Sequence, residues 1–278
     1  MVSKKLYLIT GPTASGKTDL SIELAQKLGS PILSCDSRQI YKELKIGTAP
    51  PTSSQLKAVK HYFIHSHSIF NHYTAGKYEI EALTLMDELY REHDSLVMVG
   101  GSGLYAHAVC HGIDNFPSAN LELRKELTQR VKEEGVESLR RELKLLDPVS
   151  YYQIDIANPQ RILRAIEVTL STGKKFSDYK NFRKKERPFT VESISVELER
   201  TVLYERINRR VDLMMEAGLL EEVKELYPHR HLTALKTVGY RELFDYLDGH
   251  FSLEEAVDLI KRNSRRYAKR QITWFKRY

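Results

Sequence analysis

One short segment near the N-terminus constrains the fold more than any other feature of the chain. Residues 11–18 read Gly-Pro-Thr-Ala-Ser-Gly-Lys-Thr, which satisfies the pattern G-x-x-x-x-G-K-[ST]. An apolar, β-prone run at 5–10 precedes this segment, and a run with helical spacing of apolar residues at 19–28 follows it. A strand, a glycine-rich loop and a helix in this order are the context that a phosphate-binding loop requires. We therefore predict such a loop at residues 11–18.

The loop residues suit a phosphate chemically. Two glycines let the backbone curl, so that its N–H groups and the N-terminus of the following helix face an anion. A lysine adds a positive charge, and the final threonine hydroxyl can hold Mg²⁺. Nucleotide kinases, ATPases and enzymes that bind a diphosphate leaving group all use this loop, so it does not identify the phosphate. The predicted binding residues are Gly11, Pro12, Thr13, Ala14, Ser15, Gly16, Lys17 and Thr18, with Thr18 as the metal ligand.

Further apolar runs predict an α/β fold with a parallel sheet flanked by helices. Residues 31–35 and 95–99 have the composition of short buried strands, and they end at Asp36 and Gly100. A helical pattern at 78–93 lies between them. Strands that alternate with helices form parallel sheets, which bind ligands at the C-terminal ends of the strands. The phosphate loop and the segments after these strands should therefore share one rim of the sheet.

From about residue 114 the pattern changes to charged helical segments. Helices are predicted at 121–134, 136–146 and 159–171, and the next strand pattern is at 191–196, before a helical run that begins at Arg200. We therefore expect a mostly helical insertion within the phosphate-binding core. The expected segments are a first part of the core at 1–113, the helical insertion at 114–190, and a second part of the core with a basic C-terminal helix at 191–278.

Composition points to a globular, cytoplasmic protein. The 278 residues are 41% hydrophobic and 29% charged, which is ordinary for a soluble domain. No apolar run is long enough to span a bilayer, and the first strand begins too early to leave room for a signal peptide. Cys35 and Cys110 are too few for a disulfide framework or a thiolate zinc site. Four histidines, His61, His65, His67 and His72, are close in sequence but have no recognised ligand spacing, so we expect packing roles.

Basic residues are concentrated in two segments. The formal net charge is +6, and residues 261–278 contain eight lysines and arginines and no acidic residue. A second basic cluster covers 174–175 and 180–187. A polyanion such as nucleic acid explains such a distribution, and a solvated basic face is the alternative. In the C-terminal helix the spacing predicts an inward face of Ile260, Ser264, Tyr267, Gln271, Trp274 and Tyr278, which leaves the arginines and Lys269 outward. An anionic membrane surface is the weaker partner hypothesis, because a sufficient apolar face is missing.

Several motifs, in order from residue 11 to residue 275, resemble those of the tRNA dimethylallyltransferases. Besides the phosphate loop there are six such motifs, spread over most of the chain. They are Asp36-Ser37-Arg38-Gln39-Ile40-Tyr41, Ile46-Gly47-Thr48-Ala49, Gly100-Gly101-Ser102-Gly103-Leu104-Tyr105, Pro159-Gln160-Arg161, Val238-Gly239-Tyr240-Arg241-Glu242 and Ala268-Lys269-Arg270-Gln271-Ile272-Thr273-Trp274-Phe275. The chain departs from the usual family pattern at Ser102, where threonine is more common, and at Asn158, where aspartate is. It also ends at Tyr278, where many members continue.

The resemblance implies a reaction. The family transfers a dimethylallyl group from dimethylallyl diphosphate to N6 of the adenosine at tRNA position 37, next to the anticodon, in tRNAs that read codons beginning with U. By resemblance, the loop at 11–18 holds the donor's diphosphate with Mg²⁺, although such loops are commonly labelled ATP-binding. The expected partners are the anticodon arm of tRNA and the prenyl donor, bound by a monomer.

Three residues are the predicted catalytic groups. Lys17 and Thr18 would stabilise the departing diphosphate, the latter through Mg²⁺. Asp36, at the end of a strand beside the loop, would accept the N6 proton as general base. Its alternative role is to cap a turn. Arg206 is a further candidate for the diphosphate, and a helix-surface ion pair is the equal alternative.

The target base must leave its stack to reach a buried carbon, so a pocket is expected between core and insertion. Arg124 is also compatible with a plain surface charge. The predicted RNA-binding residues are Asp36, Ser37, Arg38, Gln39, Ser102, Arg124, Gln160, Arg161, Ile162, Leu163, Arg164, Arg265, Arg266, Lys269 and Arg270. Two other functions remain open: a nucleotide or small-molecule kinase, which would use ATP, and a non-catalytic RNA-binding module, which leaves the phosphate loop unexplained.

Overall fold

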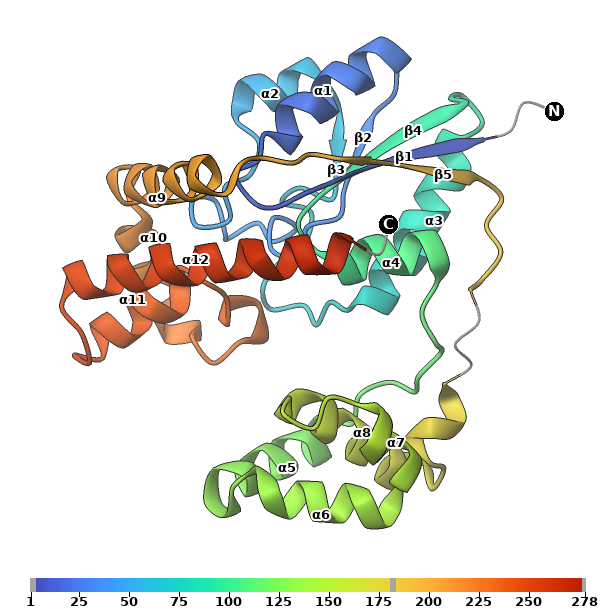
Figure 1. The fold of residues 1–278 in the computed structure, drawn as a ribbon, viewed down its shortest axis with the longest axis vertical. Helices are drawn as coiled ribbons and strands as arrows, with labels where there is room; N and C mark the ends of the chain where they lie inside the picture. The colour runs from blue at the N-terminus through green and yellow to red at the C-terminus, as the bar shows by residue number, and fades with distance from the viewer. Residues whose placement is uncertain (1–3, 181–183, 277–278) are drawn as a thin grey trace. The chain divides into compact units, whose positions relative to one another are not determined.

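The chain forms two compact units. The computed structural model describes residues 4–180 and 184–276. A core unit comprises residues 1–111 and 186–278, and a helical unit comprises residues 112–185 (Figure 1). Each unit has its own hydrophobic core.

A parallel sheet forms the centre of the core unit. In the described part of the chain its five strands are β1 (Lys5–Thr10), β2 (Ile32–Ser34), β3 (His61–Tyr62), β4 (Ser95–Val99) and β5 (Thr190–Ser195). Their order is β3-β2-β4-β1-β5, and all neighbours pair in parallel (Figure 1). This confirms the predicted α/β class. Because the strands are parallel, the segments that follow β1, β2 and β4 leave the sheet at the same edge.

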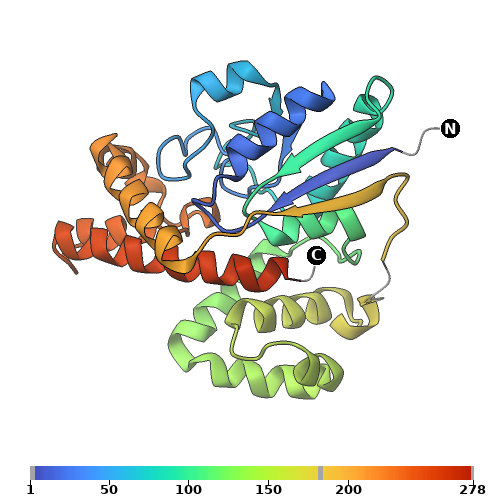
Figure 2. The same ribbon diagram turned by 45° about the horizontal axis from the view of Figure 1, so that its top comes forward.

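Helices cover both faces of the sheet: α1 (Lys17–Leu28), α2 (Ser53–Ala58), α3 (Ala75–Leu89) and α4 (Gly103–His111). Along β1, Leu6 and Leu8 pack in a cluster with side chains of α3 and α4. The alternate residues Tyr7 and Ile9 pack in a second cluster with α1 (Figure 2). Burial on both faces explains why the central strands are continuous apolar runs in the sequence.

The C-terminal part of the core unit is helical: α9 (Arg200–Glu216), α10 (Leu219–Leu226), α11 (Tyr240–Leu247) and α12 (Leu253–Phe275), with short 3₁₀ turns η2 (Tyr227–His229) and η3 (Thr233–Leu235). Helix α12 packs against both α9 and α11 (Figures 1 and 2). Of the inward face predicted for α12, Ile260 and Gln271 are buried, Ser264, Tyr267 and Trp274 are half-buried, and Tyr278 lies outside the described residues.

The start of α4 packs directly on the C-terminal end of α12. A Cβ atom added at Gly103 would lie 2.1 Å from Cδ1 and 2.2 Å from Nε1 of the Trp274 indole. We expect Gly103→Ala to lower the free energy of unfolding by about 1–3 kcal/mol, the usual cost of overpacking, as measured by urea denaturation. In combination with Trp274→Leu, which frees space, the total loss should be smaller than the sum of the two single losses. Additive losses would contradict this packing account.

The helical unit consists of α5 (Leu121–Glu134), α6 (Val136–Leu146), α7 (Pro148–Gln153), α8 (Pro159–Thr172) and the 3₁₀ turn η1 (Phe176–Tyr179). Leu127, Leu139, Leu143 and Ile166 are fully buried between these helices. The sequence placed the insertion at 114–190, whereas the unit ends at Lys185. Residues after this point belong to the core unit, where Arg187 donates hydrogen bonds to the carbonyls of Ala108 and Val109.

The histidine-rich segment around β3 is engaged in local contacts. His61 Nδ1 lies 2.8 Å from the carbonyl of Val59, and His67 Nε2 lies 3.3 Å from Glu81. Across residues 4–180 and 184–276, no group of three or more His, Cys, Asp or Glu side chains is arranged to hold a metal ion. Over the same residues, no helix is both long enough and apolar enough to cross a membrane.

Candidate active site

The predicted phosphate loop has the backbone of an anion cradle. Gly11 (φ +141°) and Gly16 (φ +93°) adopt angles that side-chain-bearing residues rarely reach. Ala14, between them, also has a positive φ of 64°, and such strain recurs at ligand sites. Helix α1 begins at Lys17, so its N-terminus adds the positive end of its dipole to the loop amides.

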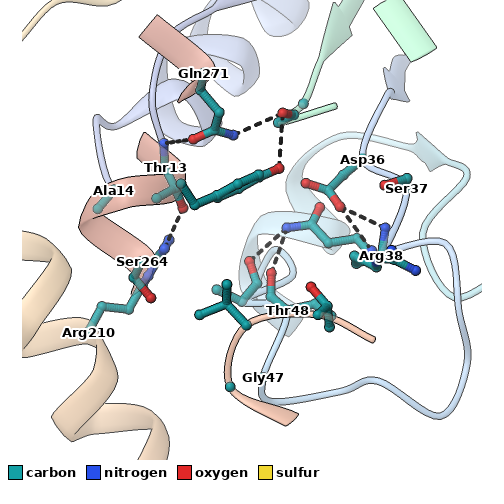
Figure 3. A pocket seen from close by; sticks show the side chains of 18 of the residues that line it. Thr13, Ala14, Asp36, Ser37, Arg38, Gly47, Thr48, Arg210, Ser264 and Gln271 are labelled. Carbon is teal, nitrogen blue, oxygen red and sulfur yellow. Dashed lines mark hydrogen bonds between the residues drawn. The ribbon is translucent and has the colours of Figure 1, made fainter. Parts of the chain in front are cut away.

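A cavity of about 420 Å³ opens beside this loop within the core unit (Figure 3). Among the described residues, its lining holds six lysine and arginine side chains and a single carboxylate, that of Asp36. The cations are Lys17, Arg38, Arg210, Lys236, Arg241 and Arg270. Such an excess of positive charge favours a ligand with several negative charges.

Besides His61 Nε2 in β3, two buried polar atoms of the cavity lining have no hydrogen-bond partner among the described residues. They are Ser15 Oγ, in the phosphate loop, and Arg210 Nε, in α9. Buried polar atoms are almost always paired, so orphaned ones require an explanation such as a ligand. An anion beside the loop would supply an acceptor to both atoms.

Arg210 takes the place that the sequence prediction gave to Arg206. Its Nη2 donates a hydrogen bond to the hydroxyl of Thr13, and its side chain lines the cavity (Figure 3). Arg206, one helical turn earlier on α9, is exposed and is not part of the lining. Arg206 and Arg210 are one helical turn apart in the sequence, and only the packing of α9 determines which of them faces the phosphate loop.

Lys17 carries a strongly perturbed charge. Burial, and then repulsion by Arg210, lower the pKa of Lys17 from 10.5 to about 8, although the negative charge of Asp36 opposes the shift. Lys17 Nζ also donates a hydrogen bond of 2.5 Å to the carbonyl of Pro12. A bound anion would favour the charged form of Lys17 and raise its pKa again.

We expect the affinity for inorganic diphosphate to fall as the pH rises through about 8. A bound anion favours charged Lys17, so above the pKa of the free protein binding must take up a proton, which costs up to about tenfold in affinity per pH unit. Calorimetry in buffers of different ionisation enthalpy measures both the affinity and the number of protons taken up on binding. Lys17→Arg, whose charge does not titrate, controls for ionisation of the diphosphate itself. Equal pH dependence in the two proteins would contradict the assignment.

Asp36 follows β2 and divides its two oxygens between two tasks. Oδ1 accepts hydrogen bonds from the backbone N–H groups of Arg38 at 2.8 Å and Gln39 at 3.2 Å (Figure 3). Asp36 therefore does cap a turn, which was one of its two sequence interpretations. Oδ2 has no hydrogen bond among the described residues, and it lies 2.9 Å from a Cβ atom built on Gly101. This second oxygen is open to accept a proton, as the other interpretation requires.

The polar residues after Asp36 are held by the protein itself. Ser37 N–H donates to Ser102 Oγ, which in turn donates to Ser37 Oγ, both at 2.8 Å. Arg38 donates to the carbonyls of η3 residues Thr233 and Ala234. These side chains were predicted to contact RNA, and the structure gives each a structural partner beside the cavity.

A second loop, which the sequence marked as a family motif at Ile46–Ala49 without giving it a role, is fixed by an acidic residue of α10. Glu222 accepts hydrogen bonds from the N–H groups of Lys45, Ile46 and Gly47 at 2.8–3.1 Å and from the hydroxyl of Tyr240 at 2.6 Å. The carbonyls of Thr48 and Ala49 then accept from Gln39 Nε2 at 3.1 and 2.9 Å. Glu222 therefore supports, through this loop, the turn that Asp36 begins.

The site has an oxygen donor that fits Mg²⁺. Thr18 lines the cavity, and a hydroxyl oxygen is one of the hard ligands that Mg²⁺ prefers. Magnesium is usually held by one or two protein oxygens together with water and substrate phosphates. Thr18 therefore matches this sparse donor set next to an anion cradle.

The basic residues of α12 differ in their availability. Arg266, Lys269 and Arg270 are exposed. Arg265 is half-buried and donates a hydrogen bond of 2.6 Å to Asn208 of α9. The first three are therefore the better candidates for contact with a polyanion, and Arg265 also links two helices. Arg277 and Arg183, from the two basic segments, lie outside the described residues.

In the helical unit, two predicted RNA-binding arginines are joined to a buried acid. Glu167 of α8 is fully buried, and Arg124 and Arg164 each form a 2.6 Å ion pair with it. Arg164 also donates to the carbonyl of Pro117. A buried carboxylate needs such partners, so both arginines have a structural role: Arg124 links α5 to α8, and Arg164 pairs with Glu167 within α8.

Two other predicted contact residues of α8 are ruled out by burial. Ile162 is 0% and Leu163 3% exposed, and both pack in the core of the helical unit. Their side chains cannot contact RNA, so these two assignments were wrong. Helix periodicity places both positions on the buried face of α8. Gln160 and Arg161, at the start of α8, are exposed and remain candidates.

Arg124→Ala and Arg161→Ala should therefore affect different properties, the first the stability of the helical unit and the second the binding of tRNA. Arg124→Ala is expected to destabilise the helical unit by about 1.5–3 kcal/mol, the usual contribution of a hydrogen bond to a charged group, because Arg164 still pairs with Glu167. Arg161→Ala should leave the melting temperature unchanged and, if Arg161 contacts a phosphate, reduce the salt dependence of tRNA binding by about one counterion. Thermal unfolding and filter binding at several salt concentrations measure the two effects. Equal losses of stability would contradict this division.

Known proteins with similar sequences belong to one enzyme family. A profile described as IPP transferase matches residues 39–278. The chain belongs to the IPP transferase family. Relatives of this family include proteins named tRNA dimethylallyltransferase 1 from Bacteroides thetaiotaomicron, 48% identical over 98% of this chain and 88% of the relative, and tRNA dimethylallyltransferase from Flavobacterium psychrophilum, 49% identical over 98% and 91%.

Solved structures of IPP transferases have the same fold. A tRNA isopentenylpyrophosphate transferase from Bacillus halodurans superposes with a TM-score of 0.70 at 39% identity, covering 99% of this chain and 88% of the other. A eukaryotic dimethylallyltransferase, described as acting on tRNA, superposes with a TM-score of 0.79 at 25% identity, covering 98% and 70%.

The departures from the usual IPP transferase pattern have little structural effect. Asn158 caps α8, because its side chain accepts a hydrogen bond from the N–H of Gln160 at 3.0 Å. Asparagine and aspartate cap helices about equally well. At Ser102, both hydrogen bonds with Ser37 use the hydroxyl, which a threonine would also provide.

Proposed function

We propose that this protein transfers a dimethylallyl group from dimethylallyl diphosphate to N6 of the adenosine at tRNA position 37, in tRNAs that read codons beginning with U, and releases diphosphate. The single observation that carries the proposal is a cavity with six cations, an anion cradle and one carboxylate. A diphosphate and an RNA backbone both require such cations, and N6 deprotonation requires one base. The names of the relatives support the same reaction.

The diphosphate end of the donor binds at the phosphate loop. Lys17, Arg210 and Ser15 converge there, and the two orphaned polar atoms supply hydrogen bonds to phosphate oxygens. When bound at Thr18, Mg²⁺ would neutralise charge on the leaving group. The cations stabilise the diphosphate most when its charge has increased, which is in the transition state. They therefore accelerate departure of the leaving group.

Asp36 accepts the proton. The lone pair of an exocyclic adenine amine is delocalised into the ring, so N6 is a weak nucleophile. As N6 bonds to the allylic carbon, the carbon–oxygen bond breaks and its electron pair leaves with the diphosphate. The N6 proton then goes to Oδ2 of Asp36, while Oδ1 stays bound to the turn. Proton transfer in the transition state is worth about 10²–10⁴-fold in rate.

The tRNA binds through its phosphates, and the target base is extruded. A stacked adenine cannot present N6 to a buried carbon, so it must flip into the cavity. Arg266, Lys269 and Arg270 on α12 and Arg161 on α8 are exposed cations for the anticodon arm. One chain supplies all of these groups, so we expect a monomer to be active, in the cytoplasm where tRNA is found.

A nucleoside assay tests the proposal. The purified protein is incubated with Mg²⁺, dimethylallyl diphosphate and an unmodified tRNA transcript with adenosines at positions 36 to 38. Mass spectrometry of the digested tRNA should detect N6-(dimethylallyl)adenosine, and a transcript with guanosine at position 37 should give none. Absence of the product, together with ATP-dependent phosphorylation of a metabolite, would replace the proposal with a kinase activity.

A further inference from the structure

Gln271, on the C-terminal helix α12, connects two segments of the active site. Its side chain is 4% exposed, and its Oε1 accepts a hydrogen bond from the backbone N–H of Thr13 at 2.8 Å. Its Nε2 donates to the backbone carbonyl of Gly101 at 2.9 Å (Figure 3). One buried amide therefore joins the phosphate loop to the segment that follows β4.

Only an amide of this length can make both bonds. The N–H of Thr13 needs an acceptor and the carbonyl of Gly101 needs a donor, and a glutamine side chain supplies one of each. An apolar residue would leave both backbone groups without this partner, and a buried unpaired group costs about 1–3 kcal/mol. Carboxylate substitution would keep the bond to Thr13 but place an acceptor against the Gly101 carbonyl.

Gly101 in turn lies against the proposed base. A Cβ atom built on Gly101 would be 2.6 Å from Gln271 Nε2 and 2.9 Å from Asp36 Oδ2. The backbone at Gly101 is therefore enclosed between the amide of Gln271 and the carboxylate of Asp36. The hydroxyl of Tyr267, one turn earlier on α12, donates to the same carbonyl at 3.1 Å. The position of the Gly101 backbone therefore determines how much room there is beside Oδ2 of Asp36, the oxygen that would accept the proton.

On the other side, Thr13 transmits the contact to the diphosphate cradle. Its N–H donates to Gln271 and its hydroxyl oxygen accepts from Arg210, so the backbone N–H of Thr13 is not available to a ligand. Arg210 and the loop residues after Thr13 are the groups that face the anion. Gln271 thus holds the phosphate loop at Thr13 from outside the loop.

We propose that Gln271 is a positioning residue that fixes the distance between the diphosphate cradle and Asp36, acting through Thr13 and Gly101. The inference rests on the proposed function, because it assigns the two ends of this bridge to the leaving group and the base. Transfer requires the donor carbon and the base to be correctly placed at the same moment. A misplacement of about 1 Å can cost about 10²-fold in rate.

The test separates positioning from folding. Gln271→Glu, of the same size, keeps the acceptor for Thr13 and loses the donor to Gly101, while Gln271→Ala loses both. At saturating tRNA and dimethylallyl diphosphate we expect kcat to fall by about 10–10²-fold, with little change in either KM. The affinity for inorganic diphosphate, measured by calorimetry, should stay close to that of the wild type.

Two controls make the outcome decisive. Thr273→Ala changes an exposed polar residue on the other side of α12 and should leave kcat unchanged. Tyr267→Phe removes the second donor to Gly101, so its effect should be non-additive with that of Gln271→Ala. A lower melting temperature with unchanged kcat per folded enzyme would overturn the positioning role. Wild-type protein that binds diphosphate but does not prenylate tRNA would instead refute the proposed function.

Discussion

Asp36→Asn is expected to lower kcat for prenyl transfer by about 10²–10⁴-fold, the usual contribution of a general base, and to leave tRNA affinity close to that of the wild type. Asparagine keeps an oxygen that accepts from the N–H groups of Arg38 and Gln39, so the turn should persist. An amide cannot accept the N6 proton. Single-turnover assays with radiolabelled donor, combined with tRNA binding, measure the two effects separately.

Comparison with Asp36→Ala isolates the two tasks of the carboxylate. Alanine removes both the base and the cap of the turn, so it should add a loss of stability of about 1 kcal/mol per hydrogen bond. The asparagine variant should be as inactive as the alanine variant but more stable. An active asparagine variant would show that Asp36 serves only as a cap.

Arg210→Ala should produce the second largest effect. Loss of one preorganised donor to a developing negative charge typically costs about 10²–10³-fold in kcat, and the affinity for inorganic diphosphate should also fall. Arg210→Lys should recover only part of the activity, because an ammonium group lacks the planar pair of donors. Single-turnover rates and calorimetry with inorganic diphosphate measure these effects.

Arg206→Ala is the matched control, one turn away on the same helix. Arg206 is exposed and lies outside the cavity lining. Its removal should therefore leave both the rate and the diphosphate affinity unchanged. A loss of rate and of diphosphate affinity in Arg206→Ala, with neither loss in Arg210→Ala, would instead make Arg206 the diphosphate ligand, as the sequence predicted.

The strands and the phosphate loop were predictable because their signals are local. The apolar runs at 5–10 and 95–99 coincide with β1 and β4, since strands buried on both faces admit few polar residues. Helix α3 was predicted from 78 but begins at Ala75, because the side chain of Thr74 caps it by accepting from the N–H of Lys77. The two-residue strand β3 is too short to produce a periodic pattern.

The structural roles that the sequence did not reveal depend on long-range pairing. Arg124 looks like any surface arginine until Glu167, 43 residues later, is found buried beside it. Likewise, nothing near Glu222 in the sequence indicates that its carboxylate binds the backbone at Lys45 and Gly47. Such pairs are created by tertiary packing, so neither residue type nor spacing reveals them.

The contacts of Glu222 also limit where the protein can bind anions. Successive backbone N–H groups that converge on one point form a nest, which attracts any negative group. In the nest at Lys45, Ile46 and Gly47 a carboxylate of the chain itself already occupies that point. The nest at the phosphate loop has no such internal occupant among the described residues. Of these two nests, only the one at the phosphate loop is therefore open to a small anion from solution.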